Sequence, residues 1–237
     1  MKAVVVVLAL CLFTARSGLG DPLELPPRAV VEASPASRYA RLGREEALAE
    51  LRHRGIAFEE VADAPGVLSP IRLEGPLHGV DIHSSLPREQ RKTTPFEILD
   101  ARLALALDDF AAILQNHDIV ELVHFTMYRP NDDVHEGTPD IRPRHPGGLA
   151  IDVGGFRKRS GARLTVKTHW PPGIGERTCG PMARKLPTRR GRELQSIVCE
   201  AKDQRLFHAI LTPHYNRAHH DHVHLEIKAD TAWFLVH

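Results

Sequence analysis

Two segments with alternating polar and apolar side chains constrain the fold more than any other part of the chain. The first begins at His145, passes through a proline and two glycines, and reaches Asp152. Proline and glycine are typical of a turn, and the alternation that follows them is typical of a strand. One face of this strand would point into the core (Leu149, Ile151 and Val153). The other would carry Asp152 between the small residues Ala150 and Gly154, as the floor of a metal site requires.

The second segment is rich in histidine, with five such residues between His214 and His224. An extended backbone here places His222, His224 and Glu226 on one face. Two imidazoles so arranged can both reach one ion, or one can bind it while the other acts beside it. One of them, with the histidine and aspartate of the first segment, would give the three protein ligands and open position of a catalytic zinc site. A lone His-x-His pair also occurs on ordinary surfaces, but both segments together predict a specific metal site.

The first 20 residues have the layout of a secretory signal peptide. Lys2 provides the positive start, an apolar run covers residues 3–13, and small residues precede Asp21. The run is shorter than the roughly 20 apolar residues that span a bilayer. A buried N-terminal helix or an uncleaved anchor is the alternative. Cleavage near Gly20 would release a chain with no further membrane span, and we expect it to be periplasmic or secreted.

Cleavage would leave Cys179 and Cys199 as the cysteines of an exported chain. In an oxidising compartment they could form a disulfide, closing a loop of about 20 residues and stabilising the fold by about 3 kcal/mol. Two unpaired thiols, or a reactive Cys179, are the alternatives. Nothing nearby resembles a catalytic cysteine triad, so we favour the disulfide.

The charge balance limits the partners of the chain. With 31 Lys and Arg against 30 Asp and Glu, the formal net charge is only +1, which argues against a nucleic-acid partner. A local basic cluster lies at Arg157, Lys158, Arg159 and Arg163. These side chains could contact an anionic polymer of the cell envelope, or they could be solvated loop residues, which is the simpler interpretation. We expect a monomer.

Composition and periodicity divide the rest of the chain. Residues 21–43 are rich in proline, alanine and serine, which predicts a flexible leader, and residues 44–237 form the expected domain. Helical spacing covers 44–55, 95–116 and 192–202, and short strands are expected within 56–77. Strand-like patterns cover 119–128, 149–156, 162–168 and 223–228, and residues 233–236 form an apolar end. A loop is expected over 130–143. This mixture predicts an α+β domain whose small, mainly antiparallel sheet carries a zinc site and is flanked by helices.

The two metal motifs resemble a known superfamily. The pattern His145-x-x-Gly148-x-Ala150-x-Asp152, followed by His222-x-His224, is similar to the zinc signature of the D-Ala-D-Ala carboxypeptidase, murein endopeptidase and hedgehog superfamily. Within it, residues 145–170 and 206–227 resemble the bacterial extensin-like C-terminal domain. The resemblance covers roughly residues 44–228, with the two motifs specific and the rest diffuse.

The resemblance implies roles for individual residues. It makes His145, Asp152 and His224 the zinc ligands. It places four further residues in or beside the reaction: His222 as an assisting histidine, His219 as a histidine found in murein endopeptidases, Asp221 where the dipeptidase branch has a catalytic glutamate, and Arg129 as a substrate or transition-state contact. Two departures concern substrate details. Pro143-Arg144 replaces the usual Ser or Thr and Glu, and no cysteine separates Tyr128 from Arg129.

These features together predict an exported zinc peptidase or amide hydrolase, of carboxypeptidase or endopeptidase type, that acts on peptidoglycan stem peptides. Zinc would activate water, His222 or Asp221 would accept its proton, and Arg129 would stabilise the developing oxyanion. Strand alternation favours His222 as the base, with Asp221 orienting a neighbouring imidazole such as His219. The alternatives are a catalytically inactive, zinc-containing cell-envelope binding module and a metal-storage protein.

Overall fold

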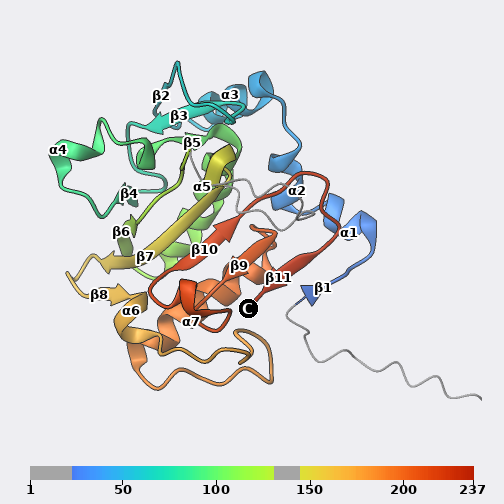
Figure 1. Cartoon of the computed structure of the whole chain (residues 1–237), viewed down its shortest axis with the longest axis vertical. Helices are drawn as coiled ribbons and strands as arrows, with labels where there is room; N and C mark the ends of the chain where they lie inside the picture. The colour runs from blue at the N-terminus through green and yellow to red at the C-terminus, as the bar shows by residue number, and fades with distance from the viewer. Residues whose placement is uncertain (1–22, 131–144) are drawn as a thin grey trace, which may run out of the picture.

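Strands and helices alternate along the residues that the computed structural model describes, which are 23–130 and 145–237 (Figure 1). The expected signal peptide, residues 1–20, and nearly all of the expected loop 130–143 lie outside these ranges. No helix within them combines the length and the apolar character that a membrane crossing requires.

The elements follow the expected segments closely. The helices are α1 (Arg28–Glu32), α2 (Pro35–Ala40), α3 (Arg44–His53), α4 (Arg88–Arg91), α5 (Ala101–Asn116), α6 (Val166–His169) and α7 (Arg189–Asp203), with 3-10 turns at η1 (Pro95–Glu97), η2 (His145–Gly147) and η3 (Arg217–His219). The strands are β1 (Leu23–Glu24), β2 (Phe58–Glu60), β3 (Pro70–Leu73), β4 (Asp81–Ser84), β5 (Leu99–Asp100), β6 (Ile119–His124), β7 (Ala150–Lys158), β8 (Arg163–Thr165), β9 (Ala209–Leu211), β10 (Val223–Glu226) and β11 (Phe234–Val236). Each segment expected to be helical or extended contains such an element, and the α+β class is confirmed.

The large sheet of the described residues has the strand order β1-β11-β9-β10-β7-β6-β4, and β8 pairs with β7. Two pairings, β4 with β6 and β9 with β11, are parallel. The expectation of a mainly antiparallel sheet is therefore wrong, because the sheet is mixed. A parallel pair needs a crossover connection, and α5 lies in the connection between β4 and β6. β2, β3 and β5 form a separate small sheet.

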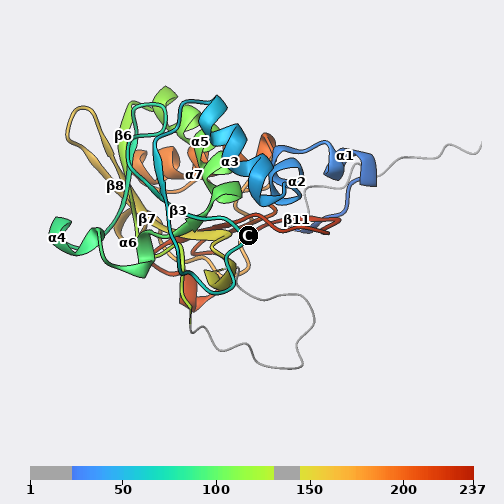
Figure 2. The same ribbon diagram turned by 90° about the horizontal axis from the view of Figure 1, so that it is seen from above.

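Helices α5 and α7 lie on the same side of the large sheet (Figure 2). Phe110 of α5 packs edge-on against Phe156 of β7, with ring centroids 6.3 Å apart, and against Phe207, at 5.7 Å. Val223 and Leu225 of β10 belong to the same hydrophobic core. Side chains of β10 that alternate with them therefore point to the opposite face of the sheet.

The helix expected from residue 95 begins later, at Ala101, because Asp100 caps it. Its carboxylate accepts hydrogen bonds from the backbone N–H of Arg102, at 3.0 Å, and of Leu68 and Ser69, at 3.1 Å each. These donors come from two segments, so the cap also ties α5 to the loop before β3. Residues 95–97 form only a 3-10 turn.

The expectation of a flexible leader does not hold for residues 23–43. They form β1, α1 and α2, and Val31, Ala36 and Ala40 are buried in the core. Pro35 is the first residue of α2, a position where the backbone N–H has no partner within the helix, so a proline is tolerated there. The Ser34 hydroxyl caps the helix by accepting a hydrogen bond from the backbone N–H of Ser37. Pro27 and Pro35 therefore stand at the starts of helices instead of keeping the chain extended.

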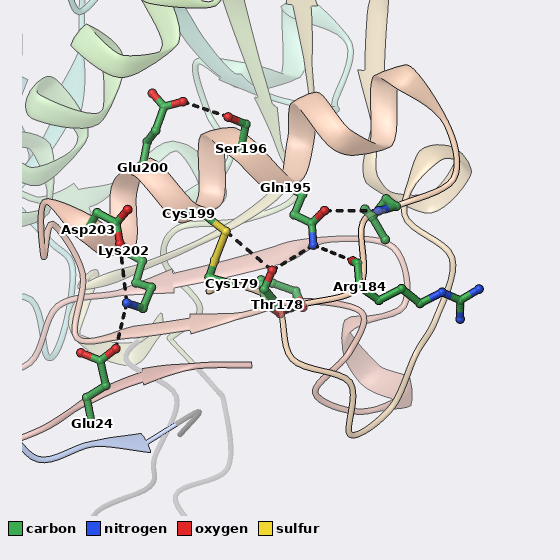
Figure 3. The surroundings of a disulfide bond; sticks show 12 residues. Glu24, Thr178, Cys179, Arg184, Gln195, Ser196, Cys199, Glu200, Lys202 and Asp203 are labelled. Atoms are coloured by element: carbon green, nitrogen blue, oxygen red, sulfur yellow. Dashed lines mark hydrogen bonds and ion pairs between the residues drawn. A yellow bond between two sulfur atoms is a disulfide. The ribbon is translucent and has the colours of Figure 1, made fainter. Parts of the chain in front are cut away.

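A disulfide between Cys179 and Cys199 joins a long loop to α7, as expected (Figure 3). Gln195, one turn earlier on α7, donates hydrogen bonds from Nε2 to the carbonyl oxygens of Thr178, at 2.9 Å, and Arg184, at 3.0 Å. The loop is thus attached to the helix by one covalent bond and by the amide of one buried glutamine.

Replacing both cysteines by serine should lower the free energy of unfolding by about 3 kcal/mol, because the bridge closes a loop of 20 residues in the unfolded chain. Denaturant titration measures the change, and the wild-type chain kept under reductant should match the variant. Equal stability of the oxidised wild type and the variant would mean that the Gln195 contacts alone hold the loop.

Candidate metal centre

The pairing of β7 with β10 brings two of the expected ligands together. In this antiparallel pair Asp152 stands directly opposite His224. The Nδ1 atom of His224 lies 3.0 Å from Oδ1 of Asp152. Because Val223 and Leu225 face the core, the polar residues of both strands share the face that the helices leave free.

His145 reaches the same carboxylate from the turn before β7. Its Nε2 atom lies 3.1 Å from Oδ1 of Asp152, and its Nδ1 atom lies 3.0 Å from the carbonyl oxygen of Met127. A carbonyl only accepts hydrogen bonds, so Nδ1 carries the proton. Gly148 makes the turn possible, because its φ of +63° suits glycine and a Cβ there would lie 2.8 Å from the backbone nitrogen of Asp100.

His145, Asp152 and His224 together could hold a metal ion. All three are buried, and one ligand atom from each lies within 4.8 Å of the others. Nitrogen atoms of the two histidines lie 3.1 and 3.0 Å from Oδ1 of Asp152, and zinc is bound by such nitrogen and oxygen ligands. The donor set also fits a cation. Because Nδ1 of His145 donates to a carbonyl oxygen, a neutral ring would turn the lone pair of Nε2 toward the carboxylate oxygen of Asp152. Two such electron-rich atoms attract each other only with a proton or a metal ion between them.

The charges around His224 favour a cation at this point. Burial disfavours the charged ring, but hydrogen bonds to Asp152 and Glu226 outweigh burial and raise the pKa of His224 to about 9. Burial likewise opposes ionisation of Asp152, yet hydrogen bonds from His145 and His224 hold the pKa of its carboxyl well below the usual range. Glu226 lies 3.1 Å from Nε2 of His224 and orients that ring. Strand alternation had placed Glu226 on this face without indicating a role.

The structure also brings Arg129, His222 and Asp221 to this group. Nη2 of Arg129 lies 2.8 Å from Oδ2 of Asp152. The Nε2 atom of His222 lies 3.5 Å from Oδ1 of Asp152, and its Nδ1 atom lies 3.0 Å from Oδ1 of Asp221. Nδ1 of His222 therefore faces the Asp221 carboxylate, and Nε2, the other ring nitrogen, faces the candidate centre.

His219 lies beside this pair but is held by a different residue. Its ring centroid is 5.0 Å from that of His222, and its Nδ1 atom lies 2.8 Å from Oδ1 of Asn216. Burial, reinforced by the neighbouring His222, lowers the pKa of His219 to about 4, so the ring is neutral at pH 7. The expectation that Asp221 orients His219 is not met, because Asp221 holds His222 instead.

A cavity of about 400 Å³ opens onto these residues. Arg129, His219, His222 and the three candidate ligands line its polar part. Its apolar part comes from residues of β9 and β11, beyond β10 in the sheet, and from the residue before β11 (Ala209, Leu211, Leu235 and Trp233). A ligand in this cavity would meet the candidate centre at one end and an apolar wall at the other.

The chain should bind one divalent transition-metal ion, and His224→Ala should abolish most of this binding, because it removes a buried ligand. His53→Ala, which changes an exposed histidine on α3, is the matched control and should keep full occupancy. Metal analysis after dialysis against a mild chelator provides the measurement. Full metal content in His224→Ala would contradict the ligand assignment.

Comparison with known families agrees with the motifs. The model of the family described as extensin-like protein C-terminus matches residues 66–235, which include β3 to β10, both candidate metal segments and most of β11. No curated protein and no solved structure matches the chain. The family match covers well over half of the chain, and the protein therefore belongs to the extensin-like protein C-terminus family.

Proposed function

We propose that this chain is an exported, zinc-dependent peptidase that hydrolyses amide bonds in peptidoglycan peptides. One observation carries the proposal. A buried group of two imidazoles and one carboxylate stands next to His222, whose Nε2 atom faces that group at 3.5 Å from Oδ1 of Asp152. Metal-assisted hydrolysis requires a group of metal ligands with a base beside it. The resemblance of both motifs to zinc peptidases supports the reaction class and the substrate.

The ligand chemistry favours zinc over the harder divalent cations. Magnesium and calcium take sets of oxygen ligands, whereas two imidazoles with one carboxylate suit zinc. Bound zinc supplies a Lewis acid that activates water and polarises the scissile carbonyl. His145, Asp152 and His224 would hold it, with Met127 and Glu226 fixing the orientation of the two imidazoles.

His222 acts as the general base in this proposal. Asp221 accepts a hydrogen bond from Nδ1, so Nε2 is the ring nitrogen available to take a proton from the attacking water and to return it to the leaving amine. A neutral imidazole suits this transfer near pH 7 better than a carboxylate, whose ordinary pKa lies near 4. Asp221 therefore serves to fix the tautomer and direction of the His222 ring.

Arg129 stabilises negative charge in this scheme. Its guanidinium contacts Asp152 and also lines the cavity, so it lies beside both the ligand group and the space for a substrate. A fixed positive charge at that position stabilises the oxyanion that develops during attack on an amide. His219, neutral at pH 7, adds a second polar group to the same wall.

Digestion of purified peptidoglycan sacculi tests the function directly. We expect the chain to release peptide fragments, to lose this activity with a chelator and to regain it with added zinc. Mass spectrometry of the products identifies the bond that is cut. Bound zinc without products under any condition would reject the enzyme and support a binding module. Several exchangeable ions per chain would instead indicate metal storage.

His222→Ala should keep zinc but lose about 10²-fold or more in turnover, which is the usual cost of removing a general base. Asp221→Ala should lose less, since the base remains but its orientation is less constrained. His220→Ala, an exposed neighbour whose ring lies 3.6 Å from Asp221, is the control and should stay close to wild type. A larger loss in Asp221→Ala than in His222→Ala, with zinc retained in both, would assign the base role to Asp221.

A further inference from the structure

A second cavity, of about 220 Å³, lies next to the candidate centre on the face of β6, β7 and β8. Asp221 lines it, while the adjacent residue, His222, lines the cavity at the candidate centre. Phe125 also lines the second cavity, and its ring centroid is 5.9 Å from that of His222. The two cavities are therefore neighbours that meet at the Asp221–His222 pair.

The floor of this second cavity is apolar and includes a glycine of β7. A Cβ on Gly154 would lie 2.9 Å from the ring of Phe125, so only glycine lets the ring rest against the strand. Phe125 is 37% exposed, so part of its ring is accessible from the cavity. The ring covers the strand surface between the proposed base and the β7–β8 hairpin, and it offers a flat apolar surface to a ligand.

Three basic side chains line the second cavity (Arg157, Arg163 and Lys167), against two acidic ones (Glu121 and Asp221). Arg157 and Arg163 stand directly opposite each other in the β7–β8 pair, an arrangement of like charges that costs stability. Arg157 forms an ion pair with Glu121 on β6. Within residues 23–130 and 145–237, neither Arg163 nor Lys167 forms an ion pair with an acidic side chain, and both are exposed. An anionic ligand would relieve the repulsion that these side chains create.

The basic cluster of the sequence divides at this hairpin. Lys158 forms an ion pair with Glu193 of α7, and Arg159 is exposed outside the cavity lining. Arg163 lines the cavity instead. The cluster is therefore not one continuous basic surface, which argues against a broad contact with an anionic polymer. It favours a localised site for a single negative group beside the candidate centre.

We propose that this second cavity is a substrate subsite, in which Arg163 and Lys167 bind a side-chain carboxylate of the peptide whose amide bond lies at the candidate centre. The inference rests on the proposed peptidase function. An extended peptide covers both cavities by passing the Asp221–His222 pair, with its apolar atoms against Phe125. Selection for acidic peptides then comes from the β7–β8 hairpin, whereas the reaction depends on the residues around Asp152.

The test measures binding of two synthetic peptidoglycan stem peptides, one with free side-chain carboxylates and one with these groups amidated. The purified chain carries His222→Ala, so that the peptide is not consumed during calorimetry. The free form should bind about tenfold more tightly than the amidated form, and added salt should reduce this preference. The double variant Arg163→Glu with Lys167→Glu should abolish it, and Arg163→Gln should weaken it in the same direction.

A matched double variant, Arg159→Glu with Arg190→Glu, changes the net charge equally at exposed sites outside the cavity. It should retain the preference. Equal binding of both peptides to the chain would overturn the subsite. An equal loss of the preference in the two double variants would also overturn it, and would indicate general attraction to an anionic polymer. Cleavage of both peptides at equal rates by the chain with His222 restored would reject the subsite but keep the peptidase. Selective binding of the free peptide without cleavage would keep the subsite but reject the peptidase.

Discussion

The register between β7 and β10 is the constraint on which the candidate centre depends. It sets Asp152 opposite His224, with His222 close enough to approach the same carboxylate. A shift of one residue would turn His224 toward the helices and bring Val223 to the cavity. The apolar residues of β10 prevent this shift, because Val223 and Leu225 are buried in the same hydrophobic core as residues of α5 and α7. Hydrophobic packing on one face of the sheet thus determines the geometry of the polar group on the other.

Asp152 shows how this polar group is balanced. A carboxylate that is only 4% exposed would be costly alone, but it contacts a guanidinium and three imidazole rings. The same partners keep it ionised and ready to bind a cation. A metal ion that binds the folded chain and not the unfolded chain also stabilises the fold. Ligand geometry and stability are therefore coupled through one side chain.

Much of this arrangement could be predicted from local patterns in the sequence. Alternation correctly assigned the core and polar faces of β7 and β10. The disulfide was predicted from the two cysteines that remain after the expected signal peptide, in the oxidising compartment expected for an exported chain. Tertiary contacts decided the rest. The start of α5 depends on Asp100 binding a distant loop, and the packing of residues 23–43 depends on a core built later in the chain. The role of Glu226 required the position of the His224 ring, which no spacing rule provides.

The place of β11 has a consequence for the order in which the protein assembles. β11 lies between β9 and β1, and Leu23, at the start of the described chain, pairs with Leu235 near its end. β1 therefore has no partner in this sheet until β11 has been synthesised. Trp233 and Leu235 also complete the apolar wall of the cavity. During synthesis this cavity cannot be completed before β11 is made, and a molecule truncated before β11 would leave one edge of β9 without its partner strand.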